Sequence, residues 1–390
     1  MNRRSDYLKQ ILKNIKNLRE KQGVSTSKLE ESLILGPGWI EHFESGKTML
    51  PLDAFLAVIN STNSNASDIF NKTTVKNDQL FPRSIYAMQN GEGIDIHFEY
   101  AKHDALFYLA AANVEQFNSV ILELRNGLSK LAQGSSASEA LKTDAVAKSF
   151  IKAVTLWPEA NPSDLWWFII YRAFCDPFNH PAIFSRLSFE QSWKRTGGWA
   201  LEEIFVRHYS PALKKNGVNM FIAPANKRVE LIKQAGIEDR LEADKADIFL
   251  TGKHGEDEIF FGIVHVKASF AERRTDDVPM SKALVDAGYV SPLLTMDCKS
   301  SPSARPFNKG ELGALLGESA DRRSAKRKDI EDDGFFSACF SYNQNTSPTP
   351  KDQAAKSFIY VNDFNSPDGD SFFKFVIAEW KNFRQRKLGV

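Results

Sequence analysis

Two short, mostly hydrophobic runs near the middle of the chain flank a polar segment. Residues 245–250 and 260–269 are rich in β-branched and aromatic side chains, and the polar segment between them contains Gly255. Two such runs joined by a short glycine-containing turn predict a β-hairpin. Because the strands of a hairpin are antiparallel, its open end is expected to bring Asp247 close to Lys267.

Apolar positions recur at helical spacing through the N-terminal part of the chain. They predict four short helices, of which the second is capped by the Ser25 hydroxyl, the third spans Trp39 to Glu44 and the fourth covers residues 52–59. This order resembles the helix-turn-helix domain of the Cro/repressor type. The resemblance implies an all-α domain over residues 1–72 whose third helix enters the major groove of DNA. The alternative is a small helical bundle that serves dimerisation or nonspecific phosphate contact.

The rest of the chain divides into a short and a long segment. Residues 73–145 predict a connecting subdomain, whereas residues 146–390 have the pattern of one larger α/β domain with aromatic-rich helices. One helix of this domain, over residues 197–209, carries an apolar stripe and two adjacent acids, Glu202 and Glu203. Both glutamates are either solvated helix charges or candidates for a site.

The composition is that of an ordinary globular protein. The chain has 390 residues, 42% of them hydrophobic and 25% charged, which is enough for two or three domains. Its net charge is only +1, so any DNA-binding surface is expected to be a local basic patch. Three separated cysteines argue against a disulfide framework and against a zinc site. The sequence lacks a signal-peptide core and a long apolar run, which predicts a cytoplasmic protein with no membrane partner.

The open end of the predicted hairpin has the groups that a nuclease needs. A carboxylate and a lysine at one sheet end can hold a divalent cation and place an ammonium beside a phosphate. The run Lys-Ala-Ser-Phe-Ala-Glu-Arg at residues 267–273 resembles the Lys-x-Ser-x-x-Glu/Asp-Arg signature of type II restriction endonucleases with the PD-(D/E)XK fold. It is most similar to the group that recognises sites with a CCGG core. A surface ion pair across the hairpin is the simpler alternative.

The resemblance implies an α/β core, with a central mixed sheet flanked by helices, in which Asp247 and Lys267 are catalytic. It also implies Mg²⁺ held by Asp247 and by a helix glutamate, for which Glu202 is the better match. The sequence departs from the family at His265, which stands where a second acid is usual, and Asp297 is the candidate to replace that acid. An imidazole is a poor Mg²⁺ ligand, so His265 either hydrogen-bonds the scissile region or is an ordinary strand histidine.

A second set of residues competes for the catalytic role. A later strand ends in Asp297-x-Lys299, and Glu311 follows twelve residues beyond that lysine. The separation of Asp247 from Lys299 also occurs between acid and lysine in the CCGG group. The short turn between the strands of Asp247 and Lys267, and the signature that follows Lys267, favour Lys267.

Sequence specificity is expected from the residues that follow Lys267. Arg273 and Arg274 can each bind guanine N7 and O6, and Glu272 can accept a hydrogen bond from cytosine N4. In the family resembled, the acid and arginine of this signature read the CC/GG core, and Ser269 belongs to the same signature. The alternative is a helix start with surface salt bridges.

These features predict a type II restriction enzyme, a Mg²⁺-dependent endonuclease that cleaves double-stranded DNA at a palindromic, GC-core site containing CCGG. A two-fold site implies a homodimer or a tetramer, and the resemblance implies a separate DNA methyltransferase that acts on the same site. The alternative function is a helix-turn-helix transcriptional regulator whose C-terminal domain binds a ligand or partner. A third hypothesis is a nuclease that cuts only modified DNA.

Overall fold

The computed structural model describes residues 3–21, 23–33, 35–45, 47–48, 84–100, 103–133, 138–180, 189–237, 245–269, 274–299, 306–312 and 324–389. Of residues 3–10, 132–133 and 274–276 it describes only the backbone. The chain divides into two compact units, residues 1–83 and 84–390. Each unit is described by itself.

Three helices form the described part of the N-terminal unit: α1 (Arg3–Lys21), α2 (Thr26–Ser32) and α3 (Trp39–Glu44). Their apolar faces meet in a small core made of Leu12, Ile15, Leu29, Ile40 and Phe43. Ser25 caps α2 as predicted, because its hydroxyl accepts the backbone N–H of Lys28. A buried ion pair, 2.6 Å between Arg19 Nε and Glu44 Oε1, fastens α3 to α1. The fourth predicted helix, over residues 52–59, lies outside the described residues.

A six-stranded mixed sheet forms the centre of residues 84–390. Its strands, in spatial order, are β4 (Val218–Phe221), β5 (Ile248–His254), β6 (Asp257–Lys267), β7 (Leu293–Thr295), β8 (Cys339–Ser341) and β9 (Ile359–Val361). Strands β4 to β6 are antiparallel, whereas β6 to β9 are parallel. Lys267 at the end of β6 pairs with Thr295 at the end of β7, so both strands end at one edge of the sheet.

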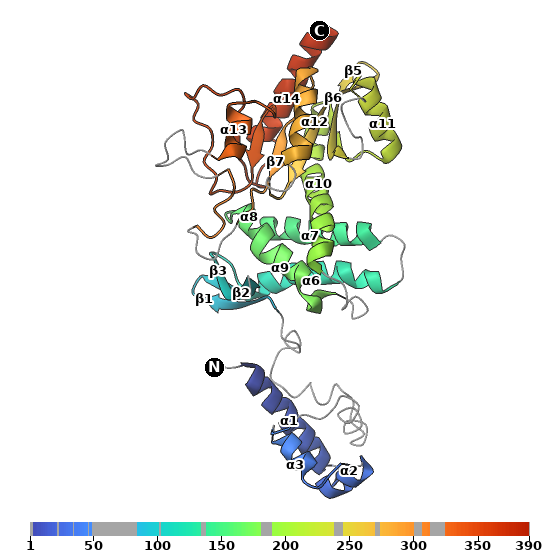
Figure 1. Cartoon of the computed structure of the whole chain (residues 1–390), viewed down its shortest axis with the longest axis vertical. Coiled ribbons are helices and arrows are strands. Elements are labelled where there is room, and N and C mark those ends of the chain that lie inside the picture. The colour runs from blue at the N-terminus through green and yellow to red at the C-terminus, as the bar shows by residue number, and fades with distance from the viewer. Residues whose placement is uncertain are drawn as a thin grey trace. The chain divides into compact units, whose positions relative to one another are not determined.

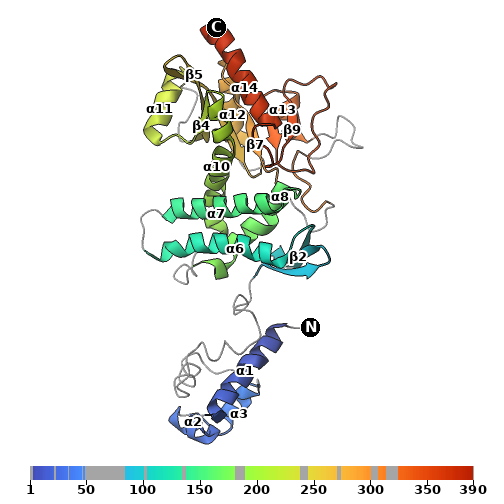
Figure 2. The same ribbon diagram turned by 180° about the vertical axis from the view of Figure 1, so that it is seen from behind.

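Helices cover both faces of this sheet. The helices concerned are α10 (Phe189–Lys215), α11 (Ala225–Gln234), α12 (Arg274–Asp286), α13 (Ala325–Glu331) and α14 (Ser371–Phe383). Side chains of β6 alternate between the faces: Val264 and Val266 pack with α10 and α14, whereas Ile263 packs with α11 and α12. Accordingly α12 lies in front of the sheet in Figure 1 and α14 lies in front in Figure 2.

A second layer adjoins the end of this α/β assembly. It contains an antiparallel sheet of β1 (Tyr86–Asn90), β2 (Gly93–Tyr100) and β3 (His103–Leu109). Its helices are α6 (Val114–Ser129), α7 (Ser138–Leu156), α8 (Pro162–Asp164) and α9 (Tyr171–Cys175), with π-helical residues Leu165–Ile170 before α9. Shorter 3-10 turns cover Lys130–Gln133 and Pro177–Asn179, and a π-helical turn, Arg384–Leu388, follows α14.

Helix α10 connects the two layers, because it packs on α7 and α9 as well as on β4 and β6 (Figures 1 and 2). One hydrophobic core extends from Ile85, which directly precedes β1, to Phe383 in α14. The predicted fold class, an α/β protein with a central mixed sheet flanked by helices, is confirmed. The predicted domain boundary between residues 145 and 146 stays a prediction.

The predicted hairpin is formed by β5 and β6. Gly255 lies in its turn with a φ of +62°, a left-handed conformation that glycine adopts without strain. Within β5, Gly252 lies against the indole of Trp380 on α14. A side chain on Gly252 would collide with that ring. The C-terminal helix therefore holds the hairpin by direct contact with its backbone.

Candidate active site

Asp247 and Lys267 meet at the open end of the hairpin. Asp247 directly precedes β5 and Lys267 is the last residue of β6. The Lys267 ammonium donates to Asp247 Oδ2 at 2.9 Å, and the Val266 backbone N–H donates to the same oxygen at 2.8 Å. The two side chains are only 12% and 13% exposed, so this is a largely desolvated pair rather than a surface one. The predicted convergence of Asp247 and Lys267 is observed.

A third charged group, Asp277 on α12, completes this cluster. Its Oδ1 lies 3.4 Å from Lys267 Nζ, and its side chain is 5% exposed. Asp277 was not among the site residues predicted from the sequence, although a signal for it exists. Asp277 is spaced three and seven residues from Met280 and Leu284, so it shares the face of α12 that packs on the hairpin.

The charges around Lys267 keep its ammonium protonated. Burial alone would lower the pKa of Lys267, but the carboxylates of Asp247 and Asp277 outweigh it and raise the pKa above its ordinary value. The Glu202 carboxylate, buried on α10, adds to this effect. The structure therefore brings together Asp247, Lys267 and Glu202 of the predicted site.

His265 lies on the same face of β6 as Lys267, but its side chain is fully buried. Its Nε2 is 3.0 Å from the Ser291 hydroxyl, and its ring packs edge-on against Phe336. Burial lowers the pKa of His265 to about 4, so the imidazole is neutral at pH 7. These contacts match the interpretation of His265 as a strand histidine.

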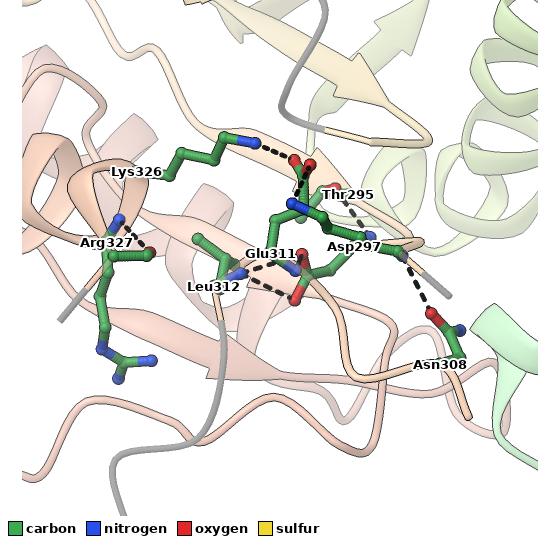
Figure 3. A network of polar contacts seen from close by, with 9 residues as sticks. Thr295, Asp297, Asn308, Glu311, Leu312, Lys326 and Arg327 are labelled. Carbon is green, nitrogen blue, oxygen red and sulfur yellow. Dashed lines mark hydrogen bonds and ion pairs between the residues drawn. The ribbon is translucent and has the colours of Figure 1, made fainter. Parts of the chain in front are cut away.

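The Asp297 carboxylate holds the chain segment that contains Glu311 and Leu312 by hydrogen bonds. It accepts the backbone N–H groups of Glu311 and Leu312, at 2.6 and 3.1 Å from Oδ1 (Figure 3). It also accepts the hydroxyl of Thr346 at 2.7 Å from Oδ2. The Asp297 backbone N–H donates to the Thr295 hydroxyl at 2.9 Å. Burial raises the pKa of Asp297 to about 6 in spite of these hydrogen bonds.

The competing set of residues also gathers, around Glu311. The Lys299 ammonium is 3.7 Å from Glu311 Oε1, and Lys326 on α13 pairs with Oε2 of the same glutamate (Figure 3). The Lys299 side chain is 65% exposed, in contrast to Lys267. Asp247 is paired with Lys267 rather than with Lys299.

The chain is similar to known type II restriction enzymes. The type II restriction enzyme AgeI of Thalassovita gelatinovora is 36% identical over 246 residues, which make up 60% of this chain and 84% of the relative. The chain belongs to the type II restriction endonuclease family. The crystal structure of the specific complex of restriction endonuclease AgeI with DNA aligns with a TM-score of 0.63 at 30% identity, over 73% of this chain and 99% of that one.

Two further comparisons add less. No protein-family model matches this restriction endonuclease. A pre-specific complex of restriction endonuclease BsaWI with DNA covers 70% of this chain and 95% of that one, at a TM-score of 0.36 and 15% identity, too low to carry an argument. The predicted enzyme class, a type II site-specific deoxyribonuclease, is confirmed by the similarity to AgeI.

The predicted recognition residues of this restriction endonuclease are described only in part. Ser269 follows β6 and is half-buried. Glu272 and Arg273 lie outside the described residues, and Arg274 begins α12, where only the backbone is described.

None of the described helices combines the length and apolarity that a membrane span requires.

The acids of the candidate site do not form a ready-made metal cage. Over the described part of the chain, no group of three or more His, Cys, Asp or Glu side chains is arranged to hold a metal ion. Instead the Lys267 ammonium lies between Asp247 and Asp277. Mg²⁺ is commonly held by one or two carboxylates, with water and substrate phosphate as the other ligands. The hard oxygen donors at the end of the hairpin fit that mode.

Proposed function

We propose that this restriction endonuclease cleaves double-stranded DNA with Mg²⁺ at a palindromic, GC-core site containing CCGG, and that it acts as a dimer or tetramer in the cytoplasm. The observation that carries the proposal is the buried Lys267 ammonium between Asp247 and Asp277 at the end of the hairpin. The similarity to AgeI, which has been crystallised with DNA, supports the substrate. A separate methyltransferase that protects the same site completes the proposal.

The residues divide the work of phosphodiester hydrolysis. The reaction needs an in-line water, neutralisation of the charge on the phosphate and a stabilised leaving oxygen. Lys267 holds a compact positive charge that orients the water and stabilises the developing negative charge. Asp247, Asp277 and Glu202 are the proposed metal ligands. A bound Mg²⁺ would supply Lewis acidity and lower the pKa of a bound water.

Hydrogen bonding supports a ranking of the remaining candidate ligands. Both hydrogen bonds to Asp247 use Oδ2, which leaves Oδ1 without a partner among the described residues. The Asp297 carboxylate, in contrast, already accepts hydrogen bonds from three donors, so we rank it below Asp277 as the replacement for the acid missing at His265. For His265 we propose an indirect role, because its buried ring supports β6 beside Lys267.

Recognition is proposed for the segment that follows β6. Glu272, Arg273 and Arg274 would read the GC core, each good contact discriminating by about 1–3 kcal/mol, and Ser269 would position them. The three helices of the N-terminal unit fit the proposed helix-turn-helix module, in which α3 would enter the major groove.

Digestion of a large DNA of mixed sequence with Mg²⁺, followed by sequencing of the ends, tests the function. We expect discrete fragments whose ends share one palindrome. Asp247→Ala and Lys267→Ala should abolish cleavage and retain specific binding, because they act on phosphate and metal rather than on bases. Lys299→Ala is the control: loss of cleavage there, with activity intact in Lys267→Ala, would move the active site to the Glu311 cluster. Fragments from methylated DNA alone would support the modified-DNA hypothesis.

A further inference from the structure

One face of α10 leads directly to the candidate active site. Gln191, Arg195, Gly198 and Glu202 follow one another at intervals of four, three and four residues, so they lie in line along the helix. We call these four residues the α10 stripe. Gln191 and Arg195 are exposed, Gly198 is partly exposed and Glu202 is buried. The stripe therefore starts on the surface and ends at Glu202, a buried acid on the helix that packs on β6.

Gly198 has no packing reason to be a glycine. A glycine inside a helix is less stable than an alanine, so it is usually retained where something must come close. At the neighbouring Gly197 a Cβ atom would lie 3.0 Å from the Trp193 ring, which explains that residue. At Gly198 a Cβ atom would meet nothing within 4 Å in the described structure. The open space lies on the outer face of α10, one turn before Glu202.

The residues beside Gly198 suit a sugar–phosphate backbone. Trp199 is 40% exposed, although a large aromatic side chain is normally buried. The Arg195 guanidinium lies 5.9 Å from the centre of the Trp199 ring, a cation–π distance, and Lys194 adds a second exposed cation. A guanidinium pairs with a phosphate and an indole packs on a deoxyribose, and contacts of this kind fix the register of a protein on DNA.

We propose that the α10 stripe and Trp199 bind the sugar–phosphate backbone of DNA in the region next to the scissile phosphate. The inference rests on the proposed nuclease function, because the stripe is continuous with the acid cluster around Lys267. Arg195 pairs with a phosphate, Gly198 lets the backbone approach the helix, and Trp199 packs on a sugar. These contacts position the reacting phosphate and do not contact any base.

The test is a binding titration of the full-length protein on a cognate and a scrambled duplex at several salt concentrations. Arg195→Ala should weaken binding to both duplexes by roughly tenfold and reduce the slope of log K against log salt by about one. Trp199→Ala should weaken both by a similar factor. The matched controls are Lys214→Ala, an exposed cation at the other end of α10, and Leu122→Ala, an exposed apolar side chain on α6.

Gly198→Gln separates a contact from a fold defect. Glutamine is a good helix former, so the variant should melt at the same or a higher temperature than the wild type, whereas its DNA affinity should fall by roughly tenfold because the backbone can no longer approach. Unchanged affinity in Gly198→Gln and Arg195→Ala would overturn the proposal, as would a changed oligomeric mass with unaltered DNA binding. A wild type that binds and cleaves no duplex would refute the nuclease function itself, a separate result.

Discussion

At the scale of single residues, the candidate site depends on one ammonium shared by two acids. Lys267 lies 2.9 Å from Asp247 and 3.4 Å from Asp277, and all three side chains are nearly buried. Removing one acid from such a cluster leaves less charge to hold a cation and to keep the lysine in place. Substitution of Asp277 is therefore expected to affect function as much as substitution of Asp247 or Lys267.

We expect Asp277→Asn to lower the rate of DNA cleavage by at least about 10–100-fold, because even groups that only support metal ligands cost this much when removed. Cognate binding without metal should be nearly unchanged. Single-turnover cleavage at several Mg²⁺ concentrations measures both effects. Asp286→Asn, an exposed acid at the end of the same helix, is the control. Full activity of Asp277→Asn would leave Asp297 as the candidate second acid.

His265 predicts a pH effect on stability. Its pKa is about 4 in the folded protein and about 6.5 when unfolded. The stability it contributes is complete above pH 6.5 and is lost as the pH falls toward 4, because the unfolded chain binds the extra proton.

The His265→Gln variant tests this effect. The gap in unfolding free energy between wild type and His265→Gln should shrink by about 3 kcal/mol from pH 7 to pH 4. Urea unfolding across that range measures it, with His42→Gln on the exposed side of α3 as the control substitution. A gap that is constant with pH would mean that the imidazole titrates normally.

At the scale of elements, the loop after β7 depends on Asp297. This residue has a φ of +44°, a left-handed conformation that Asp tolerates better than most residues, and its carboxylate gathers donors from two other segments. We expect Asp297→Ala to cost about 2–4 kcal/mol of unfolding free energy, because buried N–H groups lose their acceptor. Thermal and urea unfolding measure the loss. Asp297→Asn keeps one acceptor oxygen, so it should lower the unfolding free energy by less than Asp297→Ala does. Equal losses in the two variants would mean that the negative charge, rather than the acceptor oxygens, provides the stabilisation.

The hairpin could be predicted from the sequence, whereas the contacts of Asp297 could not. Apolar β-branched and aromatic runs and a glycine turn are local signals, and they placed Asp247 beside Lys267 correctly. The partners of Asp297 are 14 to 49 residues away in loops whose paths no periodicity specifies. Asp277 was not predicted for a related reason: the face of its helix that lies toward Lys267 is set by the packing of α12 on the hairpin. The roles of Glu272 and Arg273, which follow Lys267 so closely, stay predictions.

At the scale of the whole molecule, the two units have separate cores. The described helices of residues 1–83 bury Leu12, Ile15 and Phe43 among themselves, and residues 84–390 have their own core. We expect deletion of residues 1–83 to leave a cooperatively folding nuclease core that binds DNA more weakly. Binding should lose at least roughly tenfold, with a smaller salt slope, because phosphate contacts are lost. Titration of both proteins at matched salt measures this; equal affinities would remove the N-terminal unit from DNA binding.

The contact of Trp380 with Gly252 has a consequence for synthesis. The strands that carry Asp247 and Lys267 leave the ribosome well before α14, whose indole rests on the β5 backbone. At ~5–20 residues per second, the nascent hairpin waits several seconds for that helix. We expect the emergence of α14 from the ribosome, rather than translation of the catalytic residues, to switch on cleavage. Chains arrested before residue 371 should therefore leave nearby DNA uncut while they remain tethered.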